Sequence, residues 1–407
     1  MSDVPESAGP PPAPGALPSA APPLGSGAPR TPRPTPTPPS GGASPLGCAF
    51  ALSFALNLLA AVVVLLLFAI FLMRKPESNR LTEQHYAGKS SADDKVAIIT
   101  LDGFILEGLL SYAHKQIEQA AGDRHVKAVV VRINSPGGSI TASDDLHRKL
   151  TELRDGNSKK NRDPRPLLVS MGGMAASGGY YIAMPGKTLF AERTTVTGSI
   201  GVYASFLNVK KLADQYGVAM NTIKQGQIKD SGSPFAEMTP DERQVWQDMV
   251  DDAYQRFVQV VEQGRPMLSG GKLLEPVPVT PVHAGPAFLK KEKEKPKPYT
   301  RYLADGGVWM ADKALKHKLI DKIGTLDDAV QEAHDKAGLG DNYEVIKYER
   351  PSTLFEMLGV SGQSHAPPSG SVLDPARLQA GFAPRLWCLA PGAEASGLFA
   401  ALRAGSR

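Results

Sequence analysis

Hydrophobic and polar positions divide this chain of 407 residues into blocks of different character. The longest apolar block covers residues 48–73, which contain no charged side chain. As a helix rising 1.5 Å per residue it would be about 39 Å long, enough to cross a hydrocarbon core about 30 Å thick. A helix on the surface of a soluble domain would instead be polar on one face. The pattern predicts one transmembrane helix over residues 47–73.

The residues on either side of this predicted helix indicate whether it is cleaved and how it is oriented in the membrane. Polar sequence precedes it and no small-residue cleavage motif follows it, which favours an uncleaved anchor over a signal peptide. Arg30 and Arg33 lie before it, and more basic residues follow it: Arg74, Lys75, Arg80 and Lys89. The positive-inside rule therefore leans towards a cytoplasmic C-terminal domain, but that rule is weak for a long translocated domain.

Shorter apolar runs recur between residues 95 and 345. The runs at residues 96–101, 126–133 and 166–171 have the length and composition of buried strands. Leucines at helical spacing in residues 143–153 separate the second run from the third. Strands that alternate with helices predict an α/β domain with largely parallel strands over residues 95–345.

The remaining segments differ from this domain in composition. Residues 1–46 are rich in proline and are predicted to be disordered. Residues 74–94 form a polar linker, residues 268–300 a proline-containing and charged insertion, and residues 346–407 a poorly ordered tail. A long helix is expected over residues 238–264, which begin with a Met-Thr-Pro-Asp-Glu sequence typical of a helix start.

Composition and charge exclude several classes of function. Lys and Arg number 45 against 41 Asp and Glu, a net charge of +4 that is too small for a nucleic-acid footprint. Two cysteines, Cys48 and Cys388, cannot form a disulfide framework or a zinc site. The eight histidines lack metal-ligand spacing. We therefore expect no metal, no cofactor and no nucleic-acid partner.

The most distinctive motif surrounds Ser177. An apolar strand leads into small residues, then Ser177, then Gly178 and Gly179, then a helix-like run. Such a turn lifts a serine hydroxyl above the sheet edge, and the first amides of the helix can bind a developing oxyanion. The motif is not Gly-x-Ser-x-Gly, because Ala175 stands two residues before the serine. The alternative is that Ser177 only caps the helix.

A second glycine-rich turn, Asn-Ser-Pro-Gly-Gly-Ser at residues 134–139, also lies between a strand and a helix. Its glycines would let a substrate backbone approach closely and direct amides at an anion. The alternative is a turn in which Ser139 caps the next helix. No Gly-Lys-Ser/Thr follows, so it is not a phosphate loop.

A serine nucleophile needs a base. His125 and His147 are the nearest histidines in sequence, and His147 is predicted to lie on the surface of a helix. A lysine can act as the base where burial lowers its pKa. Lys229, in Gly-Gln-Ile-Lys-Asp, is one candidate, although taken alone it would be a surface lysine.

Taken together, four motifs resemble the signal peptide peptidase A (SppA) family of S49-type serine peptidases, in its short single-repeat form. They are Asn134-Ser-Pro-Gly-Gly, Met174-Ala-Ala-Ser-Gly-Gly-Tyr-Tyr, Thr197-Gly-Ser-Ile-Gly-Val and Thr222-Ile-Lys-Gln-Gly-Gln-Ile-Lys-Asp. The resemblance runs in order over residues 95–340, interrupted only by the insertion at 268–300. Residues 308–324 also resemble the family's C-terminal segment.

The resemblance implies a role for individual residues. Ser177 corresponds to the nucleophile of a Ser-Lys dyad and Lys229 to its general base. Ser199 matches a serine that orients the lysine. Gly138 matches an oxyanion-hole donor, and the amide of Gly178 is expected to be the second donor.

The resemblance also implies an architecture and a setting. The family's fold is ClpP/crotonase-like, built from repeated ββα units, here preceded by one transmembrane helix. Short members form dome-shaped homo-octamers whose sites combine residues of neighbouring subunits, so Ser177 and Lys229 are expected to meet across an interface. The expected substrates are signal peptide remnants in the bilayer. The expected location is the bacterial cytoplasmic membrane, with a single-pass anchor and an extracytoplasmic catalytic domain.

Two other classes of function stay open. The glycine-rich turns would suit a crotonase-like acyl-CoA enzyme, although that chemistry needs neither the anchor nor the serine and lysine. A non-catalytic membrane scaffold is the other alternative. We also hypothesise that the C-terminal tail, with small apolar residues at 397–403, occupies the cleft of its own chain. The alternative is a passive tail.

Overall fold

The computed structural model describes residues 53–66, 81–279, 298–349 and 386–391. The chain divides into two units, Met1–Pro76 and Glu77–Arg407. In the first, residues 53–66 are helical and their large apolar side chains are exposed. None of the helices within the described ranges has the length and apolar character needed to cross a bilayer. The other residues of the span predicted over 47–73 lie outside those ranges, as do residues 1–46.

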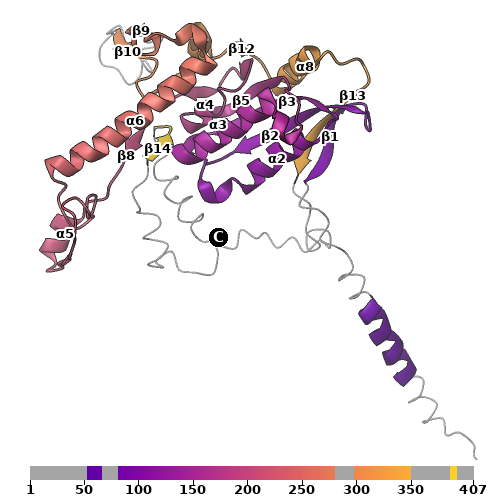
Figure 1. The fold of residues 1–407 in the computed structure, drawn as a ribbon, viewed down its shortest axis with the longest axis horizontal. Coiled ribbons are helices and arrows are strands. Elements are labelled where there is room, and N and C mark those ends of the chain that lie inside the picture. Colours follow the sequence, from indigo (N-terminus) through magenta and orange to yellow (C-terminus); the bar gives the residue numbers. More distant parts are fainter. Residues whose placement is uncertain (1–52, 67–80, 280–297, 350–385, 392–407) are drawn as a thin grey trace, which may run out of the picture. The chain divides into compact units, whose positions relative to one another are not determined.

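The second unit is built on a mixed sheet (Figure 1). Its main strands are β1 (Thr82–Gly88), β2 (Asp94–Asp102), β3 (Val126–Ser135), β5 (Leu167–Ala176), β6 (Leu189–Ala191), β12 (Lys322–Ile323) and β13 (Tyr343–Glu349). They lie in the order β1-β13-β2-β3-β5-β6-β12, and every neighbouring pair except β1 with β13 is parallel. This confirms the α/β class with largely parallel strands.

Two short strands extend this sheet beside the end of β5. β7 (Val196–Gly198) pairs parallel with β5, and β11 (Val308–Met310) pairs antiparallel with β7. A separate small sheet has the order β4-β14-β8, formed by β4 (Gly137–Ser139), β14 (Leu386–Leu389) and β8 (Tyr203–Ala204). A third sheet pairs β9 (Val277–Val279) with β10 (Tyr299–Arg301).

Helices cover both faces of the main sheet. The helices described in this unit are α2 (Ser111–Gly122), α3 (Ile140–Asp155), α4 (Gly178–Tyr181), α5 (Lys210–Gln215), α6 (Pro240–Gly264), α7 (Ala311–Lys316) and α8 (Leu326–Ala337), of which α5 lies apart from the sheet (Figure 1). Single 3-10 turns lie at Glu107–Leu109, Ser158–Lys160, Pro266–Leu268 and Lys272–Leu274.

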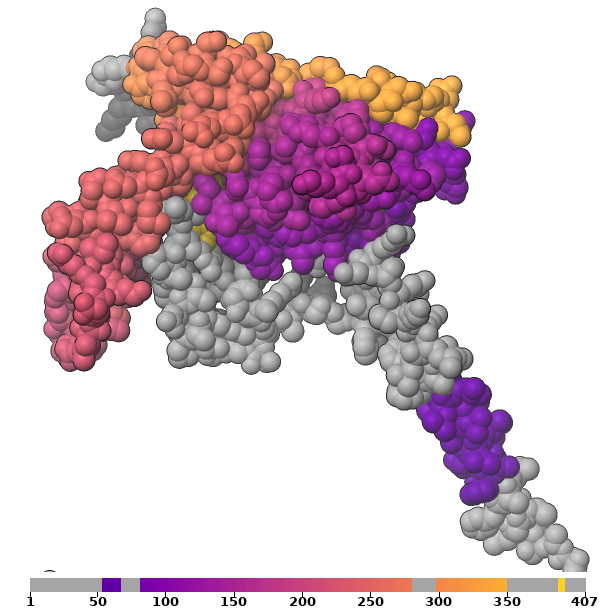
Figure 2. All heavy atoms as spheres, in the orientation of Figure 1, coloured from indigo at the N-terminus to yellow at the C-terminus, as the bar shows by residue number. Residues whose placement is uncertain are grey.

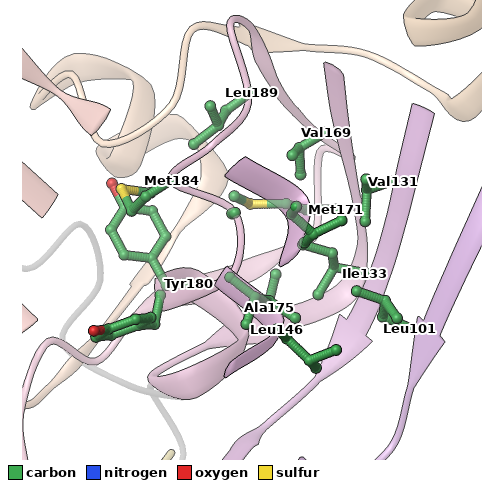
Figure 3. Packing of buried hydrophobic residues seen from close by; sticks show 14 of the residues in the cluster. Leu101, Val131, Ile133, Leu146, Val169, Met171, Ala175, Tyr180, Met184 and Leu189 are labelled. Carbon is green, nitrogen blue, oxygen red and sulfur yellow. The ribbon is translucent and has the colours of Figure 1, made fainter. Parts of the chain in front are cut away.

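The core forms two layers because successive strand residues point to opposite faces. On one face, Leu101 of β2 and Ile133 of β3 belong to the same buried cluster as Leu146 of α3 (Figure 3). On the other, Ile98 of β2 belongs to a cluster with Val330 of α8. Strands covered on both faces need apolar side chains at almost every position. The continuous apolar runs in the sequence reflect this requirement.

The helix predicted over residues 238–264 is α6. The hydroxyl of Thr239 accepts a hydrogen bond from the amide of Glu242, and the carboxylate of Glu242 accepts one from the amide of Thr239. This capping box satisfies two amides that a helix start leaves without partners. The expected start of the helix is confirmed.

Three segments expected to be irregular contain strands. β1 lies inside the predicted linker 74–94, and β9 and β10 lie at the two sides of the predicted insertion 268–300. β14 lies in the tail 346–407, which was expected to be poorly ordered, and β13 crosses the expected domain boundary at residue 345. β1 carries no buried residue, because it is an edge strand. It therefore lacks the apolar pattern by which strands are recognised.

An arm of the chain, residues 205–239, connects β8 to α6. It contains α5, which lies near the start of α6 and away from the main sheet (Figures 1 and 2). Phe206 and Trp246 hold the arm against α6, with ring centroids 4.7 Å apart. The indole of Trp246 also donates a hydrogen bond to Ser231 at 2.8 Å.

Candidate active site

Ser177 occupies a sharp turn between β5 and α4. Its backbone has φ 55° and ψ −118°, a conformation that L-residues rarely adopt. Its amide donates to the carbonyl of Gly198 at 2.7 Å, and its carbonyl accepts from the amide of Tyr181 at 2.9 Å. Such a conformation costs on the order of 1–3 kcal/mol and persists only where its surroundings impose it. The neighbouring strand and helix supply that constraint here.

The hydroxyl of Ser177 is buried and has no hydrogen-bond partner. Although Ser177 stands at the cap position of α4, its side chain makes no capping bond. Leaving a buried hydroxyl unpaired costs about 1–3 kcal/mol. Simple capping therefore does not explain this serine. A strained backbone and an unpaired buried hydroxyl together are typical of a nucleophile.

Two backbone amides lie beside the turn that carries Ser177. A Cβ atom built on Gly178 would lie 3.1 Å from the amide nitrogen of Gly138, so the two expected oxyanion donors are neighbours. The carbonyl of Gly137 and the amide of Ser139 both bond to Ile105. Because amides alternate in direction along a strand, the amide of Gly138 faces the other side, away from Ile105.

Close packing around this turn accounts for its glycines. A Cβ atom on Gly138 would lie 2.0 Å from the carbonyl oxygen of Ile105, and one on Gly178 would lie 2.5 Å from the hydroxyl oxygen of Ser143. No larger residue fits either position without moving its neighbours. Ser139 does cap α3, accepting from the amide of Ala142, so the capping alternative holds for that serine.

Ser199 lies next to Ser177 because β5 and β7 pair with Ala176 opposite Gly198. It is buried, and its hydroxyl donates to the carbonyl of Gly306 at 2.9 Å. Because this hydrogen bond uses the proton of the hydroxyl, the oxygen of Ser199 remains free to accept a hydrogen bond from an ammonium group. Ser199 also borders a pocket of about 370 Å³, together with Tyr203, Tyr254, Gly306 and Leu389 among others.

Lys229 lies apart from these residues. It is exposed on the arm, and its amide donates to the carbonyl of Gly226 at 3.2 Å. Within one chain the structure thus brings together Ser177, Ser199, Gly138 and Gly178, and it does not bring Lys229 to them.

His147 is not the surface residue that the sequence predicted. It is partly buried on α3, where its ring packs edge-on against Tyr181 at 5.4 Å. Desolvation by burial lowers the pKa of His147 to about 4, so it is neutral at physiological pH. Its ring does not hydrogen-bond to Ser177, whose hydroxyl has no partner.

The strand β14 is the part of this site that the sequence analysis missed. It pairs antiparallel with β4, with Cys388 opposite Gly138, and antiparallel with β8 on its other side. The signal was a short apolar run, Leu-Trp-Cys-Leu, inside a tail of otherwise low-complexity composition. The tail residues expected to occupy the cleft, 397–403, lie outside the described ranges.

Metal-binding clusters are absent from the described ranges: they contain no group of three or more His, Cys, Asp or Glu residues placed to hold an ion.

Comparison with known proteins gives these residues a family context. The family model described as "Peptidase family S49" matches residues 159–271 and 287–340 of this chain. A Synechocystis protein provisionally named as a protease is 32% identical over 271 residues, which cover 66% of this chain and 84% of that protein. An Enterococcus faecium protein provisionally named signal peptide peptidase SppA is 30% identical over 289 residues, covering 68% of this chain and 73% of that protein.

Two further similarities are more limited. Protease 4 of Salmonella typhi is 29% identical over 295 residues, which cover 70% of this chain and 42% of protease 4. Among solved structures, a ClpP1 mutant of Listeria monocytogenes is 12% identical and covers 57% of this chain and 94% of its own, with a TM-score of 0.31. The ClpP/crotonase-like fold stays a prediction.

Proposed function

Because this chain belongs to the S49 (SppA) family of serine peptidases, we propose that it is a membrane-anchored endopeptidase with a Ser-Lys dyad. Ser177 is the nucleophile and Lys229 the general base. The observation that carries the assignment is the strained, buried and unpaired Ser177 beside the amides of Gly138 and Gly178.

In this mechanism the hydroxyl oxygen of Ser177 attacks a peptide carbonyl and its proton passes to Lys229. The carbonyl oxygen becomes an oxyanion held by the amides of Gly138 and Gly178. Losing one such donor typically costs about 3–4 kcal/mol of transition-state stabilisation. Lys229 then protonates the leaving amine, and water activated by the same lysine hydrolyses the acyl-enzyme.

The lysine is supplied by a second copy of the chain in this proposal. The pocket beside Ser199 leaves room for a lysine side chain, and the hydroxyl oxygen of Ser199 can accept from it. Burial of such a lysine at an interface disfavours its charged form, as a general base requires. A homo-oligomer, an octamer by family resemblance, would place one chain's arm beside its neighbour's Ser177.

The exposed side chains of the arm support this assembly. Seven large apolar side chains of the arm are more than a third exposed, at Leu207, Leu212, Tyr216, Val218, Met220, Ile223 and Ile228. Apolar side chains gathered on one segment are typical of a surface that a partner covers. A second copy of the chain is the partner that the dyad requires.

The proposed substrates are remnant signal peptides, and the proposed location is the cytoplasmic membrane of a bacterium. The uncharged segment 48–73 would anchor the chain as a single-pass protein, with the catalytic domain outside the cytoplasm. Signal peptide remnants are apolar and stay in the bilayer, so an anchored peptidase meets them at a raised effective concentration. Family resemblance supports this orientation, whereas the distribution of basic residues leans the other way.

The test is hydrolysis of an apolar fluorogenic peptide by the full-length chain and by two variants. We expect Ser177→Ala and Lys229→Ala each to lower kcat by at least a factor of about 1000, because each removes a partner of the nucleophilic step. Lys211→Ala, which removes another exposed lysine of the same arm, should leave kcat unchanged. A folded parent that neither cleaves the peptide nor reacts with a serine-directed probe would favour the scaffold alternative.

A further inference from the structure

A loop with two adjacent glycines, Gly306 and Gly307, holds Ser199 in place. The hydroxyl of Ser199 donates to the carbonyl of Gly306 at 2.9 Å, and its amide donates to the carbonyl of Gly307, also at 2.9 Å. The amide of Gly306 in turn donates to the carbonyl of Ile200 at 3.0 Å. Glycine has the greatest backbone freedom of all residues, so these carbonyls need support from outside the loop to stay in place.

Arg301 and Asp305 supply that support. Nε of Arg301 donates to Oδ2 of Asp305 at 2.8 Å, and Nη2 donates to Oδ1 at 2.7 Å. Nη1 of Arg301 donates to the carbonyl of Val308 at 2.9 Å, and Oδ1 of Asp305 also accepts from the amide of Gly307 at 2.9 Å. A forked pair of this kind is stronger and geometrically more specific than a single contact. The two residues thus tie the glycine loop to the start of β11.

The guanidinium of Arg301 is packed as well as hydrogen-bonded. Its Cζ lies 4.1 Å from the ring centroid of Trp309, a cation–π contact with a buried ring. A Cβ atom built on Gly307 would lie 2.0 Å from Nη2 of Arg301, so the guanidinium occupies the space beside this glycine. One built on Gly198 would lie 2.8 Å from Cδ1 of Trp309. Because the carbonyl of Gly198 accepts from the amide of Ser177, this packing extends to the turn of the nucleophile.

Arg301 is itself anchored by the elements around it. It is the last residue of β10, at one side of the predicted insertion, and pairs with Val277 of β9. The amide of Ala304 donates to the carbonyl of Leu273 at 3.0 Å, and the hydroxyl of Tyr254 on α6 donates to the carbonyl of Ala304 at 2.7 Å. The pair of β9 with β10 and the helix α6 therefore support the loop that holds Ser199.

The direction of the Ser199 proton has a consequence for a lysine base. A hydroxyl has one proton, and here the carbonyl of Gly306 accepts it, so the oxygen of Ser199 acts only as an acceptor towards a lysine. A hydroxyl released from this carbonyl would be free to donate to the lone pair of a neutral lysine. That lone pair has to take the proton of Ser177. Holding the carbonyl of Gly306 in place therefore keeps the base available.

We propose that Arg301 and Asp305 are positioning residues for the lysine base. They fix the glycine loop, the loop fixes the hydroxyl of Ser199, and this hydroxyl orients the lysine. The two residues act through Ser199 and not on the substrate. This inference rests on the proposed function, because it takes Ser177 as the nucleophile and a lysine as its base.

The first test is steady-state hydrolysis of an apolar fluorogenic peptide by the detergent-solubilised full-length chain. We expect Arg301→Ala to lower kcat at least about tenfold and to change KM by less than about twofold, because the base is misplaced while the groove is intact. Arg154 is the matched control, since it makes the same forked pair with Asp155 and one bond to the carbonyl of Pro185. Arg154→Ala should keep both constants. An unchanged kcat in Arg301→Ala, or a rise in KM alone, would overturn the proposal.

A double-mutant cycle separates positioning from a general loss of stability. If Arg301 acts through Ser199, Arg301→Ala should change kcat by less than about twofold in a chain that already carries Ser199→Ala. Labelling by a serine-directed probe, which requires only the first attack, gives the rate constant in variants too slow to turn over. Equal losses with and without Ser199→Ala would show that the arginine only stabilises the fold, contrary to the proposal. Arg301→Lys keeps the charge without the fork, so its kcat should lie between those of the parent and Arg301→Ala, and it replaces the alanine variant in the cycle if that variant does not fold.

Hydrogen exchange tests the structural link without catalysis. In chains that carry Ser177→Ala, Arg301→Ala should make the amides of Ser199 and Gly307 exchange at least about tenfold faster, whereas Arg154→Ala should not. Unchanged exchange would overturn the proposal. A parent that hydrolyses nothing, together with faster exchange in Arg301→Ala, would refute the peptidase mechanism and leave the arginine as a support of the loop alone. The two failures can therefore be told apart.

Discussion

At the scale of single residues, the site depends on a backbone that only its surroundings maintain. Ser177 combines a positive φ with a hydroxyl that lacks a partner. Both features lower stability, and neither helps the chain to fold. They are consistent with a side chain held ready for a substrate. Strain of this kind can be measured separately from catalysis.

Substituting Ser177 by glycine and by alanine isolates the strain. Both variants lose the hydroxyl, but only glycine adopts φ 55° freely. We expect Ser177→Gly to have a free energy of unfolding about 1 kcal/mol above that of Ser177→Ala, the strain relief being partly offset by the greater entropy of glycine in the unfolded chain. Urea unfolding followed by tryptophan fluorescence measures the difference. A more stable alanine variant would show that the turn is not strained.

The burial of His147 predicts how stability depends on pH. Burial lowers the pKa of His147 to about 4 from its ordinary 6.5, so the unfolded chain binds the proton more readily between these values. Stability should therefore fall as the pH drops from about 6.5 to about 4. In His147→Gln the free energy of unfolding should depend less steeply on pH over this range. His125→Gln, at an exposed position, should keep the pH dependence of the parent. Equal slopes in all three chains, measured by urea unfolding, would contradict the assignment.

The sequence allowed prediction of those site residues that lie in local motifs. Ser177, Gly178 and Ser199 follow strands, and Gly138 lies in a tight turn. The pairing of β5 with β7 brings Ser199 beside Ser177, and close packing brings Gly138 beside Gly178. The separation of Lys229 from Ser177 within one chain could not be predicted from spacing, because it depends on where the arm extends. The burial of His147 depends on Tyr181, a contact between two helices that no local pattern shows.

At the scale of elements, one buried ion pair fixes α6 to the sheet that carries the site. The guanidinium of Arg265, which follows α6, makes two hydrogen bonds to Asp321, at 2.7 and 2.8 Å. Asp321 also accepts from the amide of Leu189 at the start of β6. The side chain of Arg265 is only 3% exposed, so its charge depends on this partner.

Removing the carboxylate should therefore destabilise the fold. We expect Asp321→Asn to lower the free energy of unfolding by about 3 kcal/mol, because it leaves a buried guanidinium without its counter-ion. Asp214→Asn removes the partner of Lys210 in an exposed pair and should cost no more than about 0.5 kcal/mol. Denaturant unfolding of both variants checks the contrast. If the two variants lost similar free energies of unfolding, the pair of Arg265 with Asp321 would not be desolvated.

Strands with two covered faces could be predicted from sequence, whereas an edge strand and a strand within the tail could not. β2, β3 and β5 appear as continuous apolar runs because helices cover both faces of the sheet. β1 has exposed side chains at an edge, and β14 lies in a tail of low complexity. Both gain stability from backbone pairing with distant strands, which leaves little trace in a local pattern.

At the scale of the whole molecule, the arm explains why one copy is not enough for the proposed mechanism. Lys229 lies on the segment whose apolar side chains are exposed, and the contact between Trp246 and Ser231 holds that segment to α6. An arm that contacts α6 and has an uncovered apolar surface can deliver its lysine to another chain. Association and activity should then fail together.

Placing a charge on the arm should separate the subunits. Ile223 is fully exposed in the single chain, and we expect Ile223→Glu to shift the protein to smaller species and to lower kcat/KM at least about tenfold, because a buried carboxylate opposes association. Light scattering of the detergent-solubilised chain measures the mass. Lys211→Glu, elsewhere on the arm, is the control for added negative charge. An unchanged mass for Ile223→Glu would place the interface on another surface.

Complementation between two inactive chains decides whether the dyad spans subunits. Ser177→Ala keeps the lysine and Lys229→Ala keeps the serine. If a site takes its serine from one chain and its lysine from the next, random mixing at equal amounts makes about a quarter of the sites complete, since such head-to-tail interfaces repeat around a closed assembly. Co-expressed chains should then recover about a quarter of the parent's kcat, and separately purified variants should recover none. A dyad formed within one chain would give no activity in either case, because every chain would lack one of its two groups.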